Sequence, residues 1–247
     1  MRIIALIMGL LVVQPVAAEG LLDLTPAERQ QLRAEIRDFL VENPEILLEV
    51  SEILEEKQNS AQSDQDIKLV DANADALLDD GFSYVTGNPD GDITVVEFLD
   101  YQCGYCKRAH PDVKALIESD QNIRLIVKEF PILGPVSVQA SRAALAVLNE
   151  QGPEKYGKFY DALMSHQGQL NEAIINKLAL DSGVDTDLMN RIAADDKVAE
   201  QILETRSLAS EMQLTGTPSF IIGKTVLRGY LPLEDLRSIV AQERAGG

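Results

Sequence analysis

Metal-binding and aromatic side chains are scarce in this chain. Its 247 residues include two cysteines, two histidines and no tryptophan. A structural zinc site uses four such ligands, whereas Cys103, Cys106 and His110 supply three at most and His166 is distant in sequence. Covalent haem attachment needs a histidine directly after the second cysteine, and Lys107 occupies that position. We therefore expect no metal or haem cofactor.

Basic residues are also few, since 22 lysines and arginines face 40 aspartates and glutamates and leave a net charge of −18. Such acidity argues against binding to nucleic acid and to anionic membrane surfaces. No internal repeat or low-complexity tract is evident. With 45% hydrophobic residues, the chain has the composition of an ordinary globular protein that is large enough for a full core.

No apolar run reaches the length of a typical transmembrane helix. The run Ile3–Val13 follows the charged start Met1–Arg2 and precedes Gln14–Ala18, which ends in small residues. This pattern predicts a cleavable signal peptide over residues 1–18, with a retained membrane anchor as the alternative. An exported protein with one cysteine pair is not a disulfide-stapled scaffold, so we expect a protein that handles disulfides in others.

The two cysteines are the most informative residues that the chain does contain. Residues 103–106 read Cys-Gly-Tyr-Cys, between a strand-like run at 93–98 and a potential helix at 107–117. This layout is typical of a thioredoxin-type redox site. The helix N-terminus favours a thiolate on Cys103, which then attacks, and Cys106 resolves the mixed disulfide. The alternatives are two inert buried thiols or a structural disulfide, whose short loop would add little stability.

Residues 19–81 are predicted to form a helical N-terminal extension. Thr25–Glu28 has the pattern of a helix capping box, Asn43–Pro44 separates two helices, and Gly81 ends the zone. The polar stretch 55–66 is either a flexible joint or a solvated helix face. Apolar residues recur at helical spacing at Leu32, Ile36, Phe39, Leu40, Ile46, Leu47, Val50, Ile53 and Leu54. These stripes must pack on the downstream domain or, as we favour, on another copy of the segment.

Residues 82–247 are predicted to form an α/β domain. A strand at 93–98, the helix after the cysteines and a strand at 123–130 make a βαβ unit with a parallel strand pair. The hydrophobic pattern of about 135–212 is helical. The further elements that we expect are a short strand at Tyr84–Val85, helices at 136–150, 154–166, 171–181 and 185–212 with a break near Asp195, a hairpin at 219–227 and a helix at 233–241.

Three segments together resemble the DsbA-like thiol–disulfide oxidoreductases of the bacterial periplasm. They are Val96–Cys106 (VEFLDYQCGYC), Lys128–Gly134 (KEFPILG) and Thr215–Phe220 (TGTPSF). The resemblance covers about residues 85–245 and implies a thioredoxin fold with an inserted helical domain. The N-terminal zone, with Asn43-Pro44-Glu45 between two helices, resembles the extension of the ScsC-like and Com1-like branches, where such helices can drive oligomerisation.

The same resemblance implies roles for residues around the cysteines. Pro218 is expected to follow a cis peptide bond, and the backbone of Thr217 is expected to pair with an extended substrate. Glu97 matches a buried acid that assists proton transfer at the second cysteine. Lys128 matches a lysine that is often paired with this acid.

Other residues near the cysteines carry weaker signals. Gly104 and Tyr105 are expected to tune the reduction potential. His110 lies one turn past the second cysteine and either supports the thiolate or is a surface residue, while His166 has no predicted role. Three aromatic residues have the spacing of core positions, namely Tyr156, Phe159 and Tyr160.

Together these features predict thiol–disulfide exchange on exported proteins in the periplasm. The Gly-Tyr dipeptide, the Thr-Pro pair and the extension favour an oligomeric isomerase or reductase, and a dithiol oxidase is the alternative. A third hypothesis is a copper-binding or chaperone protein, because soft Cu(I) suits two thiolates. The expected partners are proteins with thiols or disulfides, a membrane redox partner of DsbB or DsbD type, and further copies of the chain through residues 19–81.

Overall fold

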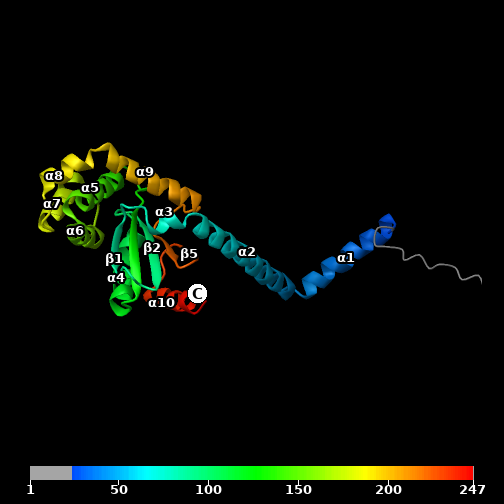
Figure 1. The fold of residues 1–247 in the computed structure, drawn as a ribbon. Coiled ribbons are helices and arrows are strands. Elements are labelled where there is room, and N and C mark those ends of the chain that lie inside the picture. The colour runs from blue at the N-terminus through cyan, green and yellow to red at the C-terminus, as the bar shows by residue number, and fades with distance from the viewer. Residues whose placement is uncertain (1–23, 247) are drawn as a thin grey trace, which may run out of the picture. The chain divides into compact units, whose positions relative to one another are not determined.

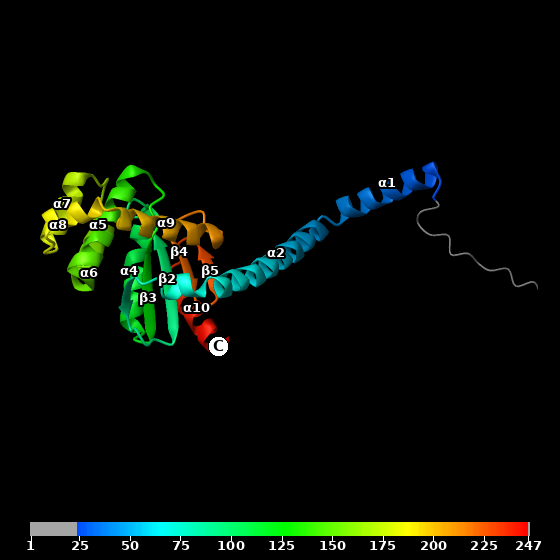
Figure 2. The ribbon, with the colours of Figure 1, turned by 45° about the horizontal axis from the view of Figure 1, so that its top comes forward.

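The computed structural model describes residues 24–246, so the predicted signal peptide at 1–18 lies outside the described residues. Contacts group the chain into two compact units, Met1–Gln58 and Asn59–Gly247. Figures 1 and 2 show the ribbon from two directions. Within residues 24–246, no helix combines the length and the apolar character that a membrane span requires.

The first unit contains α1 (Pro26–Glu42) and the first part of α2 (Glu45–Ala72). α1 begins at the predicted capping box, where the backbone N–H of Thr25 donates to Glu28 Oε2 at 2.8 Å. It ends where the side-chain amide of Asn43 donates to the carbonyl oxygen of Phe39 at 2.8 Å. The break predicted at Asn43–Pro44 therefore separates the two helices.

Apolar side chains are exposed along both helices of the first unit. α1 has no buried residue. The exposed large apolar side chains are Ile36, Phe39, Val41, Leu47, Leu48, Val50, Ile53 and Leu54. Residues 55–66 are helical throughout, as part of α2. Within the described part of the first unit, no other side chains bury the predicted apolar stripes.

A five-stranded mixed sheet organises the second unit. Its strands are β1 (Tyr84–Gly87), β2 (Ile93–Leu99), β3 (Ile123–Glu129), β4 (Ser219–Ile222) and β5 (Thr225–Arg228), in the spatial order β1-β3-β2-β4-β5. β2 and β3 are parallel and α4 (Gly104–Ser119) connects them, which confirms the predicted βαβ unit. The other strand pairs are antiparallel.

Five helices separate β3 from β4 along the chain. They are α5 (Pro135–Gln151), α6 (Pro153–Ser165), α7 (Glu172–Asp181), α8 (Thr186–Ala193) and α9 (Asp196–Glu211), with the predicted break at Asp195. α10 (Leu233–Gly246) follows β5 and extends beyond the predicted 233–241. This order is a thioredoxin fold with a helical insertion, which confirms the predicted α/β fold class.

Side-chain alternation along β2 divides its residues between the two faces of the sheet. The face that carries Val95 and Leu99 packs with α4, α5, α6 and α10 and includes both cysteines. The face that carries Val96 and Phe98 packs with α9 and with α3 (Ala74–Leu78). Because alternate residues share a face, Glu97 lies on the side of the cysteines.

Gly157 allows α6 to approach β1 closely. A Cβ atom at this position would lie 2.6 Å from the hydroxyl oxygen of Tyr84. The rings of Tyr84 and Tyr156 have centroids 4.4 Å apart, and those of Tyr84 and Tyr160 have centroids 6.4 Å apart. The close approach therefore places the tyrosines of α6 over the face of the sheet that carries the cysteines.

The last part of α2 belongs to the second unit by its contacts. Val70 and Leu77, in α2 and α3, are buried against the sheet face opposite the cysteines. Asp66 accepts hydrogen bonds from both terminal nitrogens of Arg228, at 2.7 and 2.8 Å. The extension predicted over 19–81 is thus divided within α2, because the apolar side chains after Asn59 complete the core of the second unit.

Candidate active site

Cys103 is the N-cap residue of α4, where the chain leaves β2 and enters the helix. Its sulfur accepts a hydrogen bond from the backbone N–H of Cys106 at 3.4 Å. In its protonated form the Cys103 thiol donates to the main-chain carbonyl oxygen of Thr217 at 3.1 Å. The Thr217–Pro218 peptide bond is cis, as predicted. The start of α4 and the loop before β4 therefore meet at the Cys103 sulfur.

These surroundings lower the pKa of Cys103 to about 5. The largest cause is the hydrogen bond with the Cys106 side chain. Hydrogen bonds from the Thr217 side chain and from the backbone N–H groups of Cys106 and Tyr105 lower the pKa further, while burial opposes them. Both cysteines are free thiols in this structure. Cys103 is therefore largely a thiolate at neutral pH, which suits a nucleophile and a leaving group.

Cys106 has the opposite character. It is fully buried, whereas 7% of Cys103 is exposed. Burial is the largest cause that raises the pKa of Cys106 far above its ordinary value, and the charges of Cys103 and Glu97 raise it further. The structure thus has the order of exposure and acidity predicted for an attacking Cys103 and a resolving Cys106.

Glu97 is fully buried on the central strand β2. Burial raises its pKa to about 8, and the charge of Glu129 adds to this rise. The Tyr160 hydroxyl donates to Glu97 Oε2 at 3.4 Å, whereas Oε1 has no hydrogen-bond partner among the described residues. A carboxyl group with a pKa near neutrality can both accept and return a proton, which suits an acid–base role at Cys106.

Lys128 does not pair with Glu97, and that prediction is wrong. Glu97 is in register with Val127, so the next residue of β3, Lys128, points to the opposite face of the sheet. There its ammonium group donates to Asp80 at 2.5 Å and to the carbonyl oxygen of Ala76 at 2.8 Å. Lys128 therefore fixes the segment 76–80, which precedes β1, and forms no hydrogen bond with Glu97.

Glu129 is a second buried acid that the sequence pattern did not single out. Its Oε1 accepts hydrogen bonds from the hydroxyl groups of Tyr101 at 2.6 Å and Tyr156 at 2.7 Å. Burial raises its pKa to about 7. The alternation of β3 is the signal that could have identified it, because Val127 is in register with Glu97 and Glu129 shares the face of Val127.

His110 is buried in α4 but does not support the Cys103 thiolate. Its Nδ1 lies 3.2 Å from the Tyr160 hydroxyl oxygen, and its Nε2 lies 3.1 Å from Asp161 Oδ1. Both ring nitrogens therefore face α6 and not the start of α4. The expected contribution of His110 to thiolate character is not found, because the side chain is directed away from the cysteines.

The other candidates from the sequence have structural surroundings. Gly104 is the first residue of α4 and has open space around its Cα. The carbonyl oxygen of His166 accepts a hydrogen bond from Lys107 Nζ at 2.8 Å, which ties the end of α6 to the cysteine helix. All three predicted core aromatics of α6 are buried, namely Tyr156, Phe159 and Tyr160.

An apolar edge lies beside the loop that carries the cysteines. Tyr105, Ile132 and Leu133 are all exposed large apolar side chains. Asp100, another residue that the sequence did not single out, accepts hydrogen bonds from the backbone N–H groups of Ile132 at 2.8 Å and Leu133 at 2.9 Å. It also accepts one from the backbone N–H of Gln102 at 2.8 Å. Asp100 therefore ties the loop after β3 to the cysteine loop.

Thiol–disulfide exchange needs one thiolate that attacks and a second thiol that resolves the mixed disulfide. The fold lowers the pKa of Cys103 and raises the pKa of Cys106, which suits these two roles. The class of protein that this site defines is a thiol–disulfide oxidoreductase with a thioredoxin fold. Within residues 24–246, no group of three or more His, Cys, Asp or Glu side chains is placed to hold a metal ion.

The chain belongs to the family of the DSBA-like thioredoxin domain, whose model matches residues 94–241. The N-terminal domain model of the copper resistance protein ScsC matches residues 28–61. The two matches together include both cysteines and most of the described extension, and they support the resemblance to the ScsC-like branch.

Two solved structures are similar to this chain over most of their length, and a curated relative matches it over part of its own length. A thioredoxin-like oxidoreductase from Silicibacter pomeroyi is 38% identical with a TM-score of 0.66, over 69% of this chain and 97% of that one. A linker-deletion mutant of Proteus mirabilis ScsC is 29% identical with a TM-score of 0.70, over 91% and 99% of the two chains. The Na⁺/H⁺ antiporter NhaA 1 of Salinispora arenicola is 30% identical over 68% of this chain, and the match spans 26% of the antiporter's length.

Proposed function

We propose that the protein exchanges disulfides with exported proteins in the periplasm, as an oligomeric isomerase or reductase. The observation that carries the proposal is the low pKa of Cys103, about 5, next to a Cys106 that stays protonated. A stable thiolate keeps the reduced protein ready to attack a substrate disulfide. It also makes Cys103 a good leaving group from the resulting mixed disulfide.

The chemistry begins with attack of the Cys103 thiolate on one sulfur of a substrate disulfide. The substrate S–S bond breaks, a mixed disulfide forms, and the other substrate sulfur leaves as a thiolate. In isomerisation, that sulfur attacks a further disulfide, and a later substrate thiolate frees Cys103 with no net redox change. In reduction, Cys106 loses its proton and attacks Cys103, which releases reduced substrate and leaves the Cys103–Cys106 disulfide.

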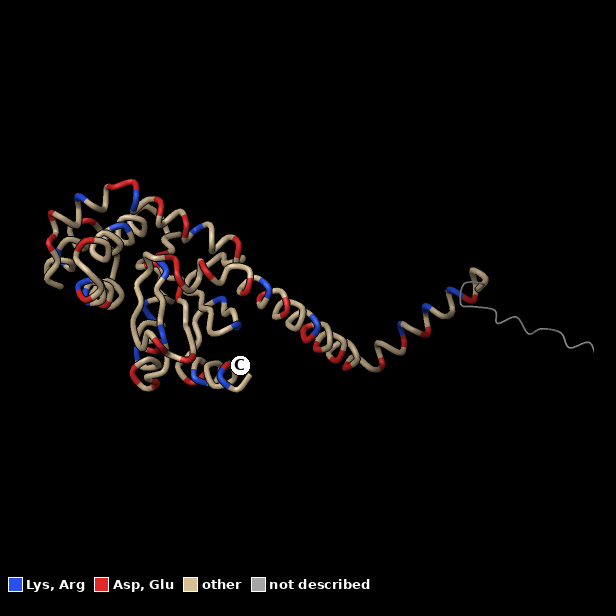
Figure 3. The backbone as a smooth tube through the Cα atoms, viewed as in Figure 1, with Lys and Arg blue, Asp and Glu red and all other residues tan. Residues whose placement is uncertain are grey.

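The exposed stripes of α1 and α2 support the oligomeric part of the proposal. Phe39 and Leu47 are 56% and 59% exposed, and large apolar side chains at helical spacing are stabilised by packing on a second helix. Figure 3 shows charged residues interspersed along both helices. Several copies would present several Cys103 sulfurs to one misfolded substrate.

A dithiol oxidase is the second candidate, and the same thiolate favours it. Stabilising the reduced form of a dithiol makes the corresponding disulfide a stronger oxidant. In this alternative a DsbB-type membrane partner would regenerate the disulfide, whereas the isomerase would need a DsbD-type partner that keeps Cys103 and Cys106 reduced.

The test is refolding of a scrambled, multi-disulfide substrate in glutathione buffer by the protein from residue 19 onward. A Phe39→Glu/Leu47→Glu variant is expected to become monomeric in sedimentation and to lose isomerase activity, while it still reduces a small disulfide. Leu180→Glu is the matched control, because Leu180 is a 64% exposed apolar residue outside the stripes. Rapid oxidation of a reduced substrate by both forms, without rearrangement, would establish the oxidase instead.

A further inference from the structure

Cys106 and Glu97 are both sealed from solvent. The exposed fraction of each is 0%. Each cycle in which Cys106 forms and then breaks a disulfide nevertheless removes a proton from Cys106 and adds one, because its sulfur attacks as a thiolate and later leaves the Cys103–Cys106 disulfide as a thiolate. If Glu97 accepts this proton, the proton needs a further route to water.

A line of hydrogen bonds leads from Glu97 to the surface between α4 and α6. The Tyr160 hydroxyl oxygen lies 3.4 Å from Glu97 Oε2 and 3.2 Å from His110 Nδ1. His110 Nε2 lies 3.1 Å from Asp161 Oδ1, and 43% of the Asp161 side chain is exposed. The two links of His110 lie within the reach of direct proton transfer, and the 3.4 Å link between Tyr160 and Glu97 is of the longer kind that shortens during a reaction. The line ends at a group that contacts solvent.

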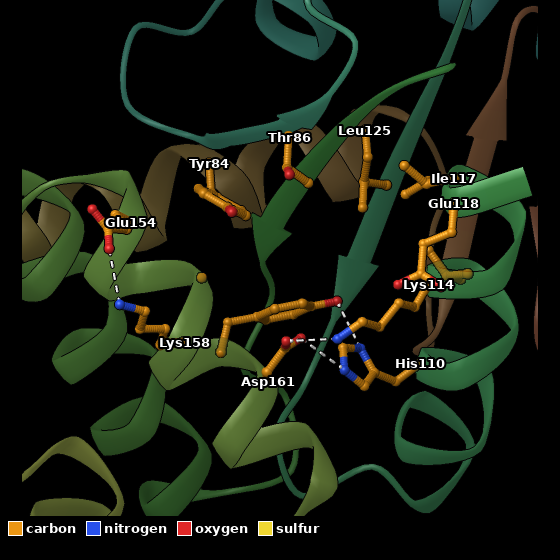
Figure 4. Close-up of a pocket in the computed structure, with 13 residues that line it drawn as sticks. Tyr84, Thr86, His110, Lys114, Ile117, Glu118, Leu125, Glu154, Lys158 and Asp161 are labelled. Atoms are coloured by element: carbon orange, nitrogen blue, oxygen red, sulfur yellow. Dashed lines mark hydrogen bonds and ion pairs between the residues drawn. The ribbon is translucent and has the colours of Figure 1, made fainter. Parts of the chain in front are cut away.

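A pocket of about 400 Å³ opens where this line reaches the surface, and His110, Tyr160 and Asp161 all line it. Figure 4 shows His110, Lys114 and Asp161 converging on one side of the pocket. Lys114 Nζ binds Asp161 Oδ2 at 2.9 Å, which leaves Oδ1 directed at the histidine. The carboxylate at the end of the line is therefore held in place by a cation that is itself in solvent.

Among residues 24–246, the hydrogen bonds of the other buried acid do not lead to an exposed group. Glu129 accepts hydrogen bonds from Tyr101 and Tyr156, and both tyrosines are 0% exposed. Tyr156 and Tyr160 lie one turn apart on α6 with stacked rings at an interplanar angle of 8°. The Tyr160 hydroxyl is linked through His110 to the exposed Asp161, whereas the Tyr156 hydroxyl bonds to the buried Glu129.

We propose that Tyr160, His110 and Asp161 form a relay that carries protons between Glu97 and solvent during exchange at Cys106. The inference rests on the resolving role of Cys106 in the proposed function and holds for either direction of exchange. The elements packed around the relay contribute further titratable groups. They are Lys114 and Glu118 on α4, Glu154 and Lys158 on α6, Tyr84 on β1, Glu129 on β3 and Tyr101 after β2.

The proton steps balance when Cys106 resolves a mixed disulfide. Cys106 gives its proton to the Glu97 carboxylate, and its thiolate attacks Cys103 and expels the substrate thiolate. The carboxyl proton of Glu97 then moves to the Tyr160 oxygen while the Tyr160 hydroxyl proton moves to His110 Nδ1. The His110 imidazolium releases its Nε2 proton to Asp161 or to solvent. When Cys106 later leaves the disulfide as a thiolate, the reverse sequence delivers one proton and restores the starting tautomer.

The experiment follows resolution of the mixed disulfide between Cys103 and glutathione, by acid quench and mass spectrometry of the intact protein. Tyr160→Phe is expected to slow glutathione release by about tenfold or more, as the loss of a proton-transfer group does. Tyr156→Phe removes the neighbouring hydroxyl and is expected to stay within about twofold of the wild-type rate. Titration of the Cys103 thiolate should give the same pKa in all three proteins.

A second variant separates proton transfer from a structural effect. His110→Ala is expected to slow the same step and to leave a space that opens into the pocket. Free imidazole should then restore the rate of His110→Ala in proportion to its concentration and should leave Tyr160→Phe slow. A residue that only supports packing would not be replaced by a small base in solution.

The outcomes distinguish the relay from the function on which it rests. A wild-type protein that never releases glutathione from Cys103 would contradict the resolving role of Cys106 and, with it, the relay. Normal wild-type release together with an unchanged rate in Tyr160→Phe would overturn the relay alone. Equal slowing in Tyr160→Phe and Tyr156→Phe, or the absence of rescue by imidazole, would also overturn it.

Discussion

Asp66 and Arg228 lie 162 residues apart in the sequence and form an ion pair through two hydrogen bonds of 2.7 and 2.8 Å. The Asp66 side chain is 7% exposed and the Arg228 side chain 33% exposed. The Arg228 guanidinium holds the pKa of Asp66 below its ordinary value. The pair joins the last turns of α2 to the edge strand β5.

Removing this pair is expected to destabilise the second unit. We expect Asp66→Asn to lower the free energy of unfolding by about 1–3 kcal/mol in urea titrations at neutral pH, because the pair is largely shielded from solvent. Asp71→Asn removes an ion pair in which Asp71 and Lys224 are each 56% exposed, and it should cost less than about 1 kcal/mol. Equal losses in the two variants would contradict an anchoring role for Asp66.

The effect of Asp66→Asn should depend on pH with a defined sign. The pKa of Asp66 is lower in the folded than in the unfolded state, so its stabilising contribution is complete above the unfolded-state pKa. The difference between wild type and variant should therefore shrink as the pH falls through the folded-state pKa. Unfolding titrations in urea at a series of acidic pH values measure this.

Thr217→Val is expected to raise the pKa of Cys103 from about 5, because it removes the side-chain hydrogen bond of Thr217, which is one of the causes that lower this pKa, and keeps the main-chain carbonyl. The rise should be roughly one unit, which corresponds to the loss of one ordinary hydrogen bond. Ultraviolet absorbance of the thiolate measures it. Thr215→Val, an exposed residue of the same loop, is the control and should leave the titration unchanged.

The two buried acids predict how stability changes with pH. The pKa of Glu97 is about 8 and that of Glu129 about 7 in the folded protein, against an ordinary value of 4.5. The folded state therefore keeps protons that the unfolded state has released, and stability should fall as the pH rises from about 4.5 to 8. Urea unfolding should show that Glu97→Gln flattens this fall up to pH 8, and that Glu129→Gln flattens it only up to about pH 7. Identical profiles for both variants would contradict the assignment.

Gly157→Ala is expected to destabilise the second unit by about 1–3 kcal/mol, because the new methyl group would crowd the hydroxyl of Tyr84. Tyr84→Phe removes the oxygen that the methyl group would meet. Thermal unfolding of the double variant should therefore show a smaller loss than the sum of the two single variants. Strict additivity would mean that α6 and β1 are not in tight contact at this point.

The catalytic unit could largely be predicted from local patterns. The strand before Cys103, the helix after it and the break at Asp195 are all marked by residues next to them in the sequence. The cis bond before Pro218 came from the family motif, which carries this feature as a unit. These elements were accessible because their causes lie within a few residues of each other.

The features that the sequence did not predict have a different physical origin. The predicted pairing of Lys128 with Glu97 is wrong because the resemblance places Lys128 beside Glu97 along the sheet but does not say which face its side chain occupies. Val127 is in register with Glu97, so the side chain of the adjacent Lys128 lies on the opposite face. The division within α2 depends on Arg228, which no local pattern connects to Asp66. The contact of His110 with Tyr160 likewise exists only because α4 and α6 pack together.

Tyr84, Tyr101, Tyr156 and Tyr160 are four of the six tyrosines of the chain, and their rings cluster around the two buried acids. Since the chain has no tryptophan, its near-ultraviolet spectrum comes mainly from this cluster. A change of charge on Glu97 or Glu129 alters the hydrogen bond of a neighbouring chromophore. The protein thus contains its own optical indicator of the protonation state behind its active site, without any added label.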